Sequence, residues 1–199
     1  HKEYRRQRQM CIRDRTQTAR DWFRDQAQST ASAAVTPSRV IRASADQSKN
    51  KIMVGGMFLF QYDPKMKKEL PYYDTFPLIF PIEPVAGGFL GINMHYLPLP
   101  ARARLMDALF DLATDTRYDE NTKLRLSYNV LKSASRFRLF EPCLKKYLNS
   151  HIKSRLIQIP AEQWDIALFL PLERFAKANK ATVWTCLLYT SDAADDTPC

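Results

Sequence analysis

The order of apolar patterns after Lys51 is the feature of this sequence that most constrains its fold. Strand-like runs come first, helical spacing follows, and strand-like runs then return. The expected strands are Ile52–Tyr62, Thr75–Ile82, Phe89–Tyr96, Ser154–Ile159 and Asp165–Leu170. The expected helices are Ala101–Ala113, Asn121–Ser135 and Pro142–Asn149. Because strands and helices are grouped rather than alternating, we predict an α+β fold: an antiparallel sheet, or a small and partly open β-barrel, with a helical insertion.

Glycines and prolines mark bends and turns within the expected strands. Gly55 and Gly56 interrupt the first strand and favour a bend or bulge there. Pro77 and Pro81 lie inside the second strand. Because proline cannot donate a backbone hydrogen bond to a neighbour, we expect that strand at the edge of the sheet. Ala86–Gly88 has the composition of a tight hairpin turn between two strands.

The two ends of the chain differ in character from the rest. His1–Arg15 and Cys186–Cys199 resemble translated adapter read-through at the edges of genes assembled from environmental DNA, through the strings MCIRDR and CLLYTSDAAD. We therefore interpret both ends as artefacts and leave them out of the fold. The 170 residues between them are enough for one ordinary core.

An N-terminal arm, Thr16–Asn50, precedes the single expected domain, Lys51–Thr185. A short helix with two aromatic anchors is expected at Thr18–Gln28. The following stretch, Ser29–Asn50, is rich in Ser, Ala, Thr and Gln and has no aromatic residue. Such a stretch buries too little apolar surface to offset its ordering entropy, so we predict a flexible linker.

Leaving out the ends changes what cysteine and charge imply. Three of the four cysteines fall in the ends, which leaves Cys143 and argues against a disulfide framework or a cysteine metal site. A single thiol suits a reducing compartment. Thr16–Thr185 contains 24 basic and 16 acidic residues, a net charge of +8.

The positive charge is concentrated in Lys123–Arg155, where Glu141 is the single acidic residue. The net charge of this segment, +8, equals the whole excess of Thr16–Thr185. Concentrated charge creates a local field that attracts a polyanion, either DNA or an acidic protein. The residues that we expect to contact a phosphate backbone are Lys123, Arg125, Lys132, Arg136, Arg138, Lys145, Lys146, Lys153 and Arg155.

A second basic group lies in a loop-like stretch before two tyrosines and consists of Lys65, Lys67 and Lys68. It suits contact with phosphate or single strands, and lysines also protect an exposed strand edge from unwanted pairing. The aromatic residues among the basic ones suit either a stacking platform or the core, and we favour the core for Phe137, Phe140 and Tyr147.

The sequence lacks motifs for catalysis or cofactor binding. Gly87–Gly91 has neither the Lys-Ser/Thr of a P-loop nor a dinucleotide fingerprint, and His95 and His151 have no partners at zinc-ligand spacing. From the absence of these motifs we expect no cofactor and no metal. We also expect no membrane span, because no apolar run approaches the roughly 18 to 20 residues that a span needs. The enzyme alternative is a metal-dependent nuclease that uses a lysine of the 65–68 loop with Asp63, Asp74 and Glu83.

Four blocks of the sequence resemble a small family of virion proteins from marine contractile-tailed phages. The blocks are MFLFQYDPKMKKELPYYDTFPLIFPI, GGFLGINMHYLP, KLRLSYNVLKSASRF and EPCLKKYLNSHIKSRLIQIPAEQWDIALFLP. Members of this family resemble DNA end protectors, which bind the ends of packaged phage DNA and shield them from host nucleases. The resemblance brings no site residue with it.

What the resemblance implies is a non-enzymatic DNA-binding protein of the virion, present in the host cytoplasm during assembly. It would protect or organise DNA ends, with little dependence on base sequence because phosphate neutralisation drives the binding. The structural alternative is a head, neck or baseplate component whose basic face meets an acidic virion protein.

Overall fold

The computed structural model describes residues 36–113, 115–134 and 140–192. The expected helix Thr18–Gln28 and the first part of the expected linker lie outside this range. So do Phe137 and two of the basic residues expected to contact DNA, Arg136 and Arg138.

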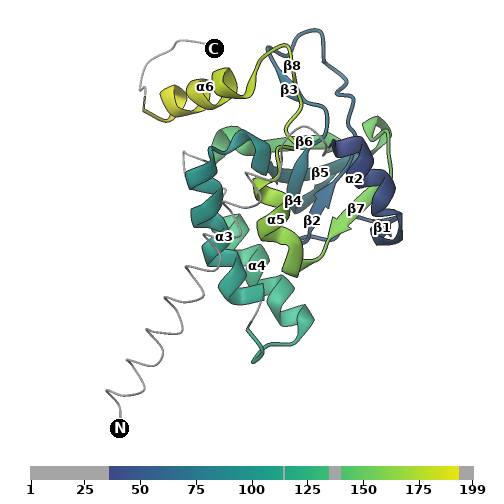
Figure 1. Ribbon diagram of the computed structural model, residues 1–199, viewed down its shortest axis with the longest axis vertical. Coiled ribbons are helices and arrows are strands. Elements are labelled where there is room, and N and C mark those ends of the chain that lie inside the picture. The colour runs from purple at the N-terminus through teal and green to yellow at the C-terminus, as the bar shows by residue number, and fades with distance from the viewer. Residues whose placement is uncertain (1–35, 114, 135–139, 193–199) are drawn as a thin grey trace.

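Six antiparallel strands form the main sheet, in the order β1-β7-β2-β4-β5-β6 (Figure 1). The strands are β1 (Ser48–Lys49), β2 (Met57–Leu59), β4 (Leu78–Val85), β5 (Gly88–Asn93), β6 (Leu144–Leu148) and β7 (Leu156–Ile159). A separate antiparallel pair joins β3 (Tyr73–Asp74) to β8 (Phe175–Ala176). In the described part of the chain, the end strands β1 and β6 do not pair, so the sheet is open. The prediction of an α+β fold with an antiparallel sheet is confirmed.

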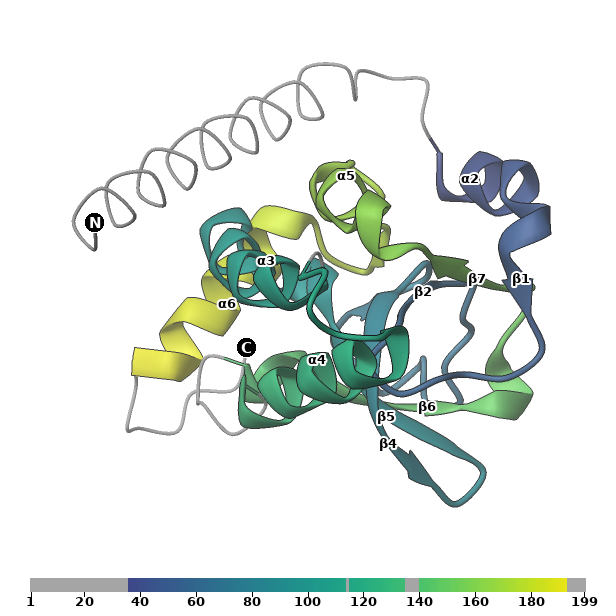
Figure 2. The ribbon, with the colours of Figure 1, turned by 90° about the horizontal axis from the view of Figure 1, so that it is seen from below.

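The helices are α2 (Pro37–Ala43), α3 (Leu99–Ala113), α4 (Glu120–Ala134), α5 (Trp164–Phe169) and α6 (Lys180–Asp192). Single 3₁₀ turns lie at Ala45–Gln47, Met94–Tyr96, Glu141–Cys143, Asn149–His151 and Ala161–Gln163. Helices α3 and α4 separate β5 from β6 along the chain and pack together beside the sheet (Figure 2). They are the expected helical insertion. Their amphipathic spacing predicted both to within two residues at each end.

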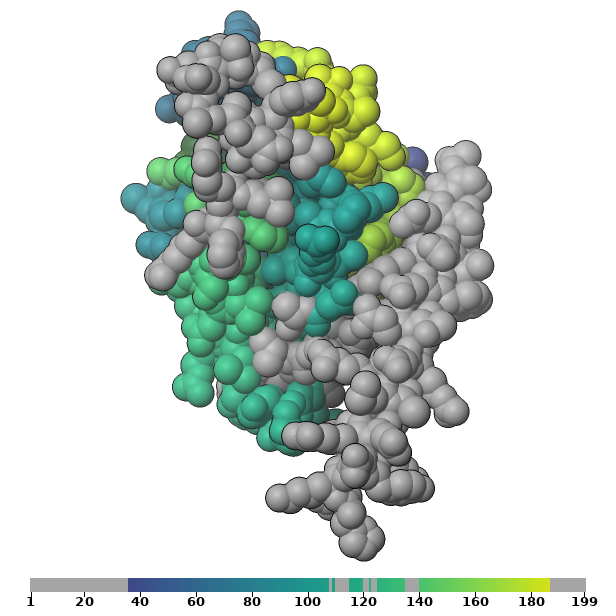
Figure 3. All heavy atoms as spheres, turned by 90° about the vertical axis from the view of Figure 1, so that its left-hand side faces the viewer, coloured from purple at the N-terminus to yellow at the C-terminus, as the bar shows by residue number. Residues whose placement is uncertain are grey.

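Alternation of side chains along the strands gives the sheet two different faces. Met57 and Leu59 point into the large core beneath α3, α4 and α5, which we call the helical face. Phe58 and Phe60 point the other way and pack with Tyr62, Ile79, Phe89 and Tyr147 in a second cluster, which we call the aromatic face. We call the outer surface formed by α3 and α4 the helical side of the molecule. Figure 3 shows it, with α3 and α4 next to each other.

The prediction that the strand with these prolines lies at the edge of the sheet is wrong. The corresponding strand, β4, lies inside the sheet, between β2 and β5. Its prolines are tolerated because β2 pairs only with the first part of β4, through Leu78 and Ile79. From Pro81 onward β4 pairs in register with β5 alone, and the register shifts between Pro81 and Glu83. The hairpin prediction is confirmed, since Val85 pairs with Gly88 and Gly87 adopts a left-handed φ of 74°.

The predicted type of secondary structure is wrong for two short segments. Pro142–Asn149, expected as a helix, forms a 3₁₀ turn and then strand β6, because stacking of Tyr147 on Phe89 of β5 fixes it to the sheet. Asp165–Leu170, expected as a strand, forms helix α5. Short apolar runs of this length do not distinguish strand from helix, so tertiary packing decides.

The described part of the expected linker Ser29–Asn50 contains regular structure. The side chain of Thr36 accepts a hydrogen bond from the backbone N–H of Arg39 and caps α2, with Pro37 at its first position. Strand β1 then pairs with β7. At the other end, α6 extends past Thr185 to Asp192, and its Trp184 packs against the core.

Cys143 is fully buried, and burial raises the pKa of its thiol to about 12. In a variant with Cys11, Cys186 and Cys199 replaced by serine, native Cys143 should react with Ellman's reagent at pH 8 at least about a thousandfold more slowly than in denaturant. Because the folded-state pKa is raised above the unfolded value of 9.0, the thiol should also make stability fall as pH rises above about 9. Equal reaction rates in the native and denatured protein would contradict this burial.

Candidate nucleic-acid interface

The chain segment between β6 and β7, residues 149–155, crosses the aromatic face and divides it into two hollows. The backbone N–H of Asp63 donates to the carbonyl of His151 at 3.0 Å, and that of Lys153 donates to Gln61 at 2.8 Å. Between them, Tyr62 and Ile152 form a β-bridge. Leu148 lines one hollow, and its neighbour in the sequence, Asn149, lines the other hollow. The two hollows are therefore adjacent.

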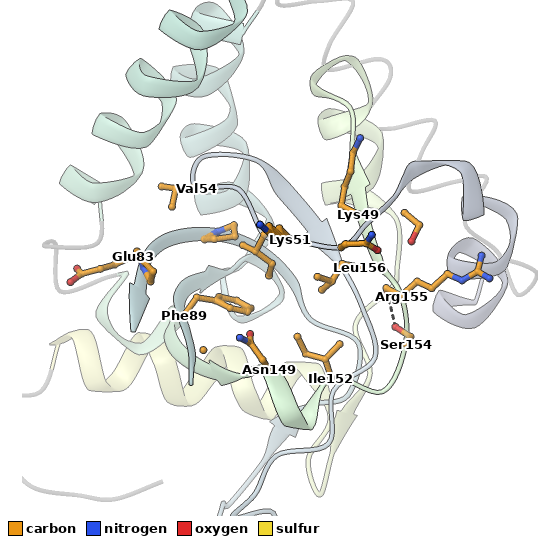
Figure 4. Close-up of a pocket in the computed structure, with 16 residues that line it drawn as sticks. Lys49, Lys51, Val54, Glu83, Phe89, Asn149, Ile152, Ser154, Arg155 and Leu156 are labelled. Carbon is orange, nitrogen blue, oxygen red and sulfur yellow. Dashed lines mark hydrogen bonds between the residues drawn. The ribbon is translucent and has the colours of Figure 1, made fainter. Parts of the chain in front are cut away.

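The larger hollow is a groove of about 660 Å³, which we call the basic groove. Among the described residues that line it, Lys49, Lys51 and Arg155 are basic and Glu83 is acidic. Figure 4 shows Glu83 and Arg155 at opposite sides of the groove, with Lys51 between them. The three basic side chains are exposed. The groove thus presents more positive than negative charge to solvent.

Pairing of β1 with β7 brings these three basic residues together, although about a hundred residues separate Lys51 from Arg155 in the sequence. Lys49 lies opposite Leu156 in the register, next to Arg155. The sequence pattern identified Arg155 but not Lys49, which falls in the expected linker, or Lys51, the first residue of the expected domain. Nothing local in the sequence indicates that this stretch adds a strand to the sheet.

The smaller hollow, of about 340 Å³, is lined by five tyrosines, and we call it the tyrosine pocket. The tyrosines are Tyr62, Tyr72, Tyr73, Tyr96 and Tyr147. Three of the expected DNA-contacting lysines line it as well: Lys65, Lys145 and Lys146. The structure therefore joins the two basic groups that are separate in the sequence. Tyr147 is buried and Phe140 packs against the core, as expected for both.

The remaining basic residues lie in several places. Lys67 forms an ion pair with Asp63 at 2.9 Å, and its hydrogen bond is the main cause that lowers the pKa of Asp63. Lys68 and Lys153 are exposed. Arg125 and Lys132 are exposed on α4, at the helical side, and the Lys123 side chain lies outside the described residues. The basic segment of the sequence is thus divided between α4, β6 and the residues just before β7.

A buried polar network closes the inner end of the tyrosine pocket. The carboxylate of Asp74 lies 2.7 Å from Nδ1 of His95 and accepts hydrogen bonds from the Asn93 amide and the Phe76 backbone. The Asn93 amide also donates to the Tyr147 hydroxyl at 3.1 Å. His95 is a core residue, while half-buried His151 has its Nδ1 2.8 Å from the carbonyl oxygen of Asp63.

The three carboxylates of the nuclease alternative occupy different environments. Asp63 pairs with Lys67 at the surface, Asp74 is buried in the network, and Glu83 lines the basic groove. Within the described residues, no group of three His, Cys, Asp or Glu side chains could hold a metal ion. Of the lysines in the 65–68 loop that could assist these carboxylates, Lys67 is already paired with Asp63.

One known protein family matches this chain. No helix in the described ranges has the length and apolar character to cross a bilayer. Searches of curated proteins and of solved structures found no match. The family model of the phage T4 terminal DNA protecting protein matches residues 1–187. This agrees with the resemblance to DNA end protectors drawn from the sequence. The chain belongs to the family of the phage T4 terminal DNA protecting protein.

Proposed function

We propose that this protein binds the ends of phage DNA, largely independently of base sequence, and shields them from nucleases without catalysing a reaction itself. It acts in the virion and, during assembly, in the host cytoplasm. The observation that carries the proposal is the basic groove, whose lining includes Lys49, Lys51 and Arg155 from segments far apart in the sequence. Cations that line one groove neutralise successive phosphates and release counterions. Family membership points to the DNA terminus as the bound form.

Salt dependence and end protection test the proposal on the full chain. Anisotropy with a fluorescent blunt duplex should show affinity falling roughly 40- to 150-fold between about 50 and 200 mM salt, for three or four phosphate contacts.

Linear DNA with bound protein should resist a double-strand exonuclease. Closed circular DNA cut by an endonuclease serves as the control, and its cleavage should be little affected. Absence of both binding and end protection at the lower salt would overturn the proposal. Stable capture of acidic virion proteins in that case would favour the structural alternative.

A further inference from the structure

The tyrosine pocket has the size of a small-ligand site and about half the volume of the basic groove. Its volume of about 340 Å³ lies near the lower end of the roughly 300 to 1,000 Å³ of such sites. It opens beside the basic groove, because Leu148 lines the pocket and the next residue lines the groove. A DNA strand that ends in the groove therefore lies next to the pocket mouth.

The pocket walls offer aromatic surface that the core leaves partly uncovered. Tyr62, Tyr96 and Tyr147 are buried, whereas Tyr72 and Tyr73 are only half-buried. The ring of Tyr72 lies 6.1 Å from that of Tyr96, at a tilt of 37°. Half-buried rings of this kind are platforms on which an unpaired base stacks, whatever its identity.

The lysines of the pocket provide charge for a phosphate. Lys145 is half-buried, with its Nζ 4.7 Å from the centre of the Tyr96 ring. Burial lowers the pKa of the Lys145 amine. The contact with the Tyr96 ring does not neutralise the ammonium group, so an incoming anion relieves the cost of burying this charge. Exposed Lys65 and Lys146 add charge at the pocket.

Among the described residues that line the pocket, Asp74 is the one carboxylate, beside three lysines. Asp74 uses one oxygen to accept from the Phe76 backbone and the other to contact Asn93 and His95. Its carboxylate is therefore held inside the buried network. Three lysines against one carboxylate leave the described pocket lining with a positive excess, which complements a phosphate.

The loop that forms one wall is fixed before any ligand arrives. The Asp63–Lys67 ion pair and the bond from the Leu70 N–H to the Met66 carbonyl close the loop on itself. The ammonium group of Lys177 also donates to the carbonyls of Lys68 and Leu70, at 3.0 and 2.8 Å. A preformed wall reduces the ordering cost of binding.

We propose that the tyrosine pocket holds one unpaired nucleotide at the end of a DNA strand, with its base against Tyr72 and Tyr73 and its phosphate beside Lys145 and Lys146. This inference rests on the proposed function and names the part of the DNA that the protein distinguishes. The basic groove holds the duplex through its phosphates, and the pocket recognises that the strand ends.

The test compares four DNA ligands by anisotropy with the full chain. They are a blunt duplex, the same duplex with a one-nucleotide overhang at either the 5′ or the 3′ end, and a closed circle as competitor. Wild-type protein should bind one of the overhang duplexes roughly tenfold more tightly than the blunt duplex, the effect of one stacked base. Tyr73→Leu combined with Lys145→Gln should remove this difference and leave blunt-duplex affinity within about twofold. Lys68→Gln, in the same loop but outside the pocket, is the matched control and should keep the preference.

A second variant guards against misfolding of the first. Lys65→Gln combined with Lys146→Gln changes exposed side chains only and should reduce the preference to about threefold or less. Equal binding of blunt and overhang ends by the wild type, or an unchanged preference in both pocket variants, overturns the inference while duplex binding and the proposed function stand. Loss of all DNA binding by the wild type instead overturns the proposed function. A free 5′-mononucleotide that binds as tightly as the overhang end assigns the pocket to free nucleotides and also overturns the inference.

Discussion

Replacement of Arg102 by methionine should lower the free energy of unfolding by about 3–5 kcal/mol. Arg102 is fully buried and forms an ion pair with Glu173 at 2.6 Å. Its guanidinium also donates to the carbonyls of Leu97, His95 and Leu168, at 2.8 to 3.0 Å. Methionine keeps most of the side-chain volume but removes the donor from a buried carboxylate and from the carbonyls of Leu97 and Leu168. The His95 carbonyl keeps the Trp184 indole N–H as a donor. That desolvation penalty is the main part of the expected loss.

The pH dependence of this variant distinguishes a lost charge partner from lost packing. Burial would raise the pKa of Glu173, but the charge and hydrogen bond of Arg102, together with His95 and a backbone hydrogen bond, hold that pKa below its usual value. In the wild type, this contribution is present above about pH 4.5 and is lost as pH falls through the folded-state pKa. Without Arg102, protonation of Glu173 relieves the buried charge, so the deficit of the variant should shrink towards pH 4.

Urea denaturation at pH 7 and pH 4 measures both effects. Arg104→Met, on the same helix but exposed, is the matched control and should change stability by less than about 0.5 kcal/mol. A loss below about 1 kcal/mol for Arg102→Met, or a deficit that does not depend on pH, would contradict the role assigned to this ion pair.

Charge reversal in the basic groove should abolish most DNA binding. The triple variant Lys49→Glu, Lys51→Glu and Arg155→Glu should raise Kd for a blunt duplex by at least about 100-fold. It should also flatten the slope of log K against log salt by about one unit for each lost phosphate contact. All three side chains are exposed, so the fold should be retained.

The control for net charge is a second triple variant on the helical side: Arg104→Glu, Arg125→Glu and Lys132→Glu. It changes the net charge by the same amount and should weaken binding by less than about fivefold. Both variants are measured by anisotropy at two salt concentrations. If the two triples weaken binding equally, net charge rather than the groove governs binding. A larger effect of the helical-side triple would transfer the footprint to α4, which the sequence also favoured.

Much of the fold followed from local patterns. Helices α3 and α4 carry long amphipathic repeats, and a run of 15 residues has enough turns for its period to be unambiguous. The Ala86-Gly87 turn needs a left-handed residue, which glycine supplies. By contrast, β6 and α5 have five and six residues, and their type was set by what they pack against. Aromatic stacking on β5 draws β6 into the sheet, and the buried residues Trp164, Ala167 and Leu168 place α5 on the helical face.

The sequence by itself determined the fold class, the position of the helical insertion, the family resemblance and the concentration of positive charge. Only the tertiary structure decided which cations share a surface. Helix and turn patterns depend on neighbours within a few residues, so they can be read along the chain. The groove and the pocket depend on pairing between distant segments, β1 with β7 and the 61–63 stretch with residues 151–153. Such pairings leave no local trace in the sequence, which is why Lys49 and Lys51 were missed and the two lysine groups looked separate.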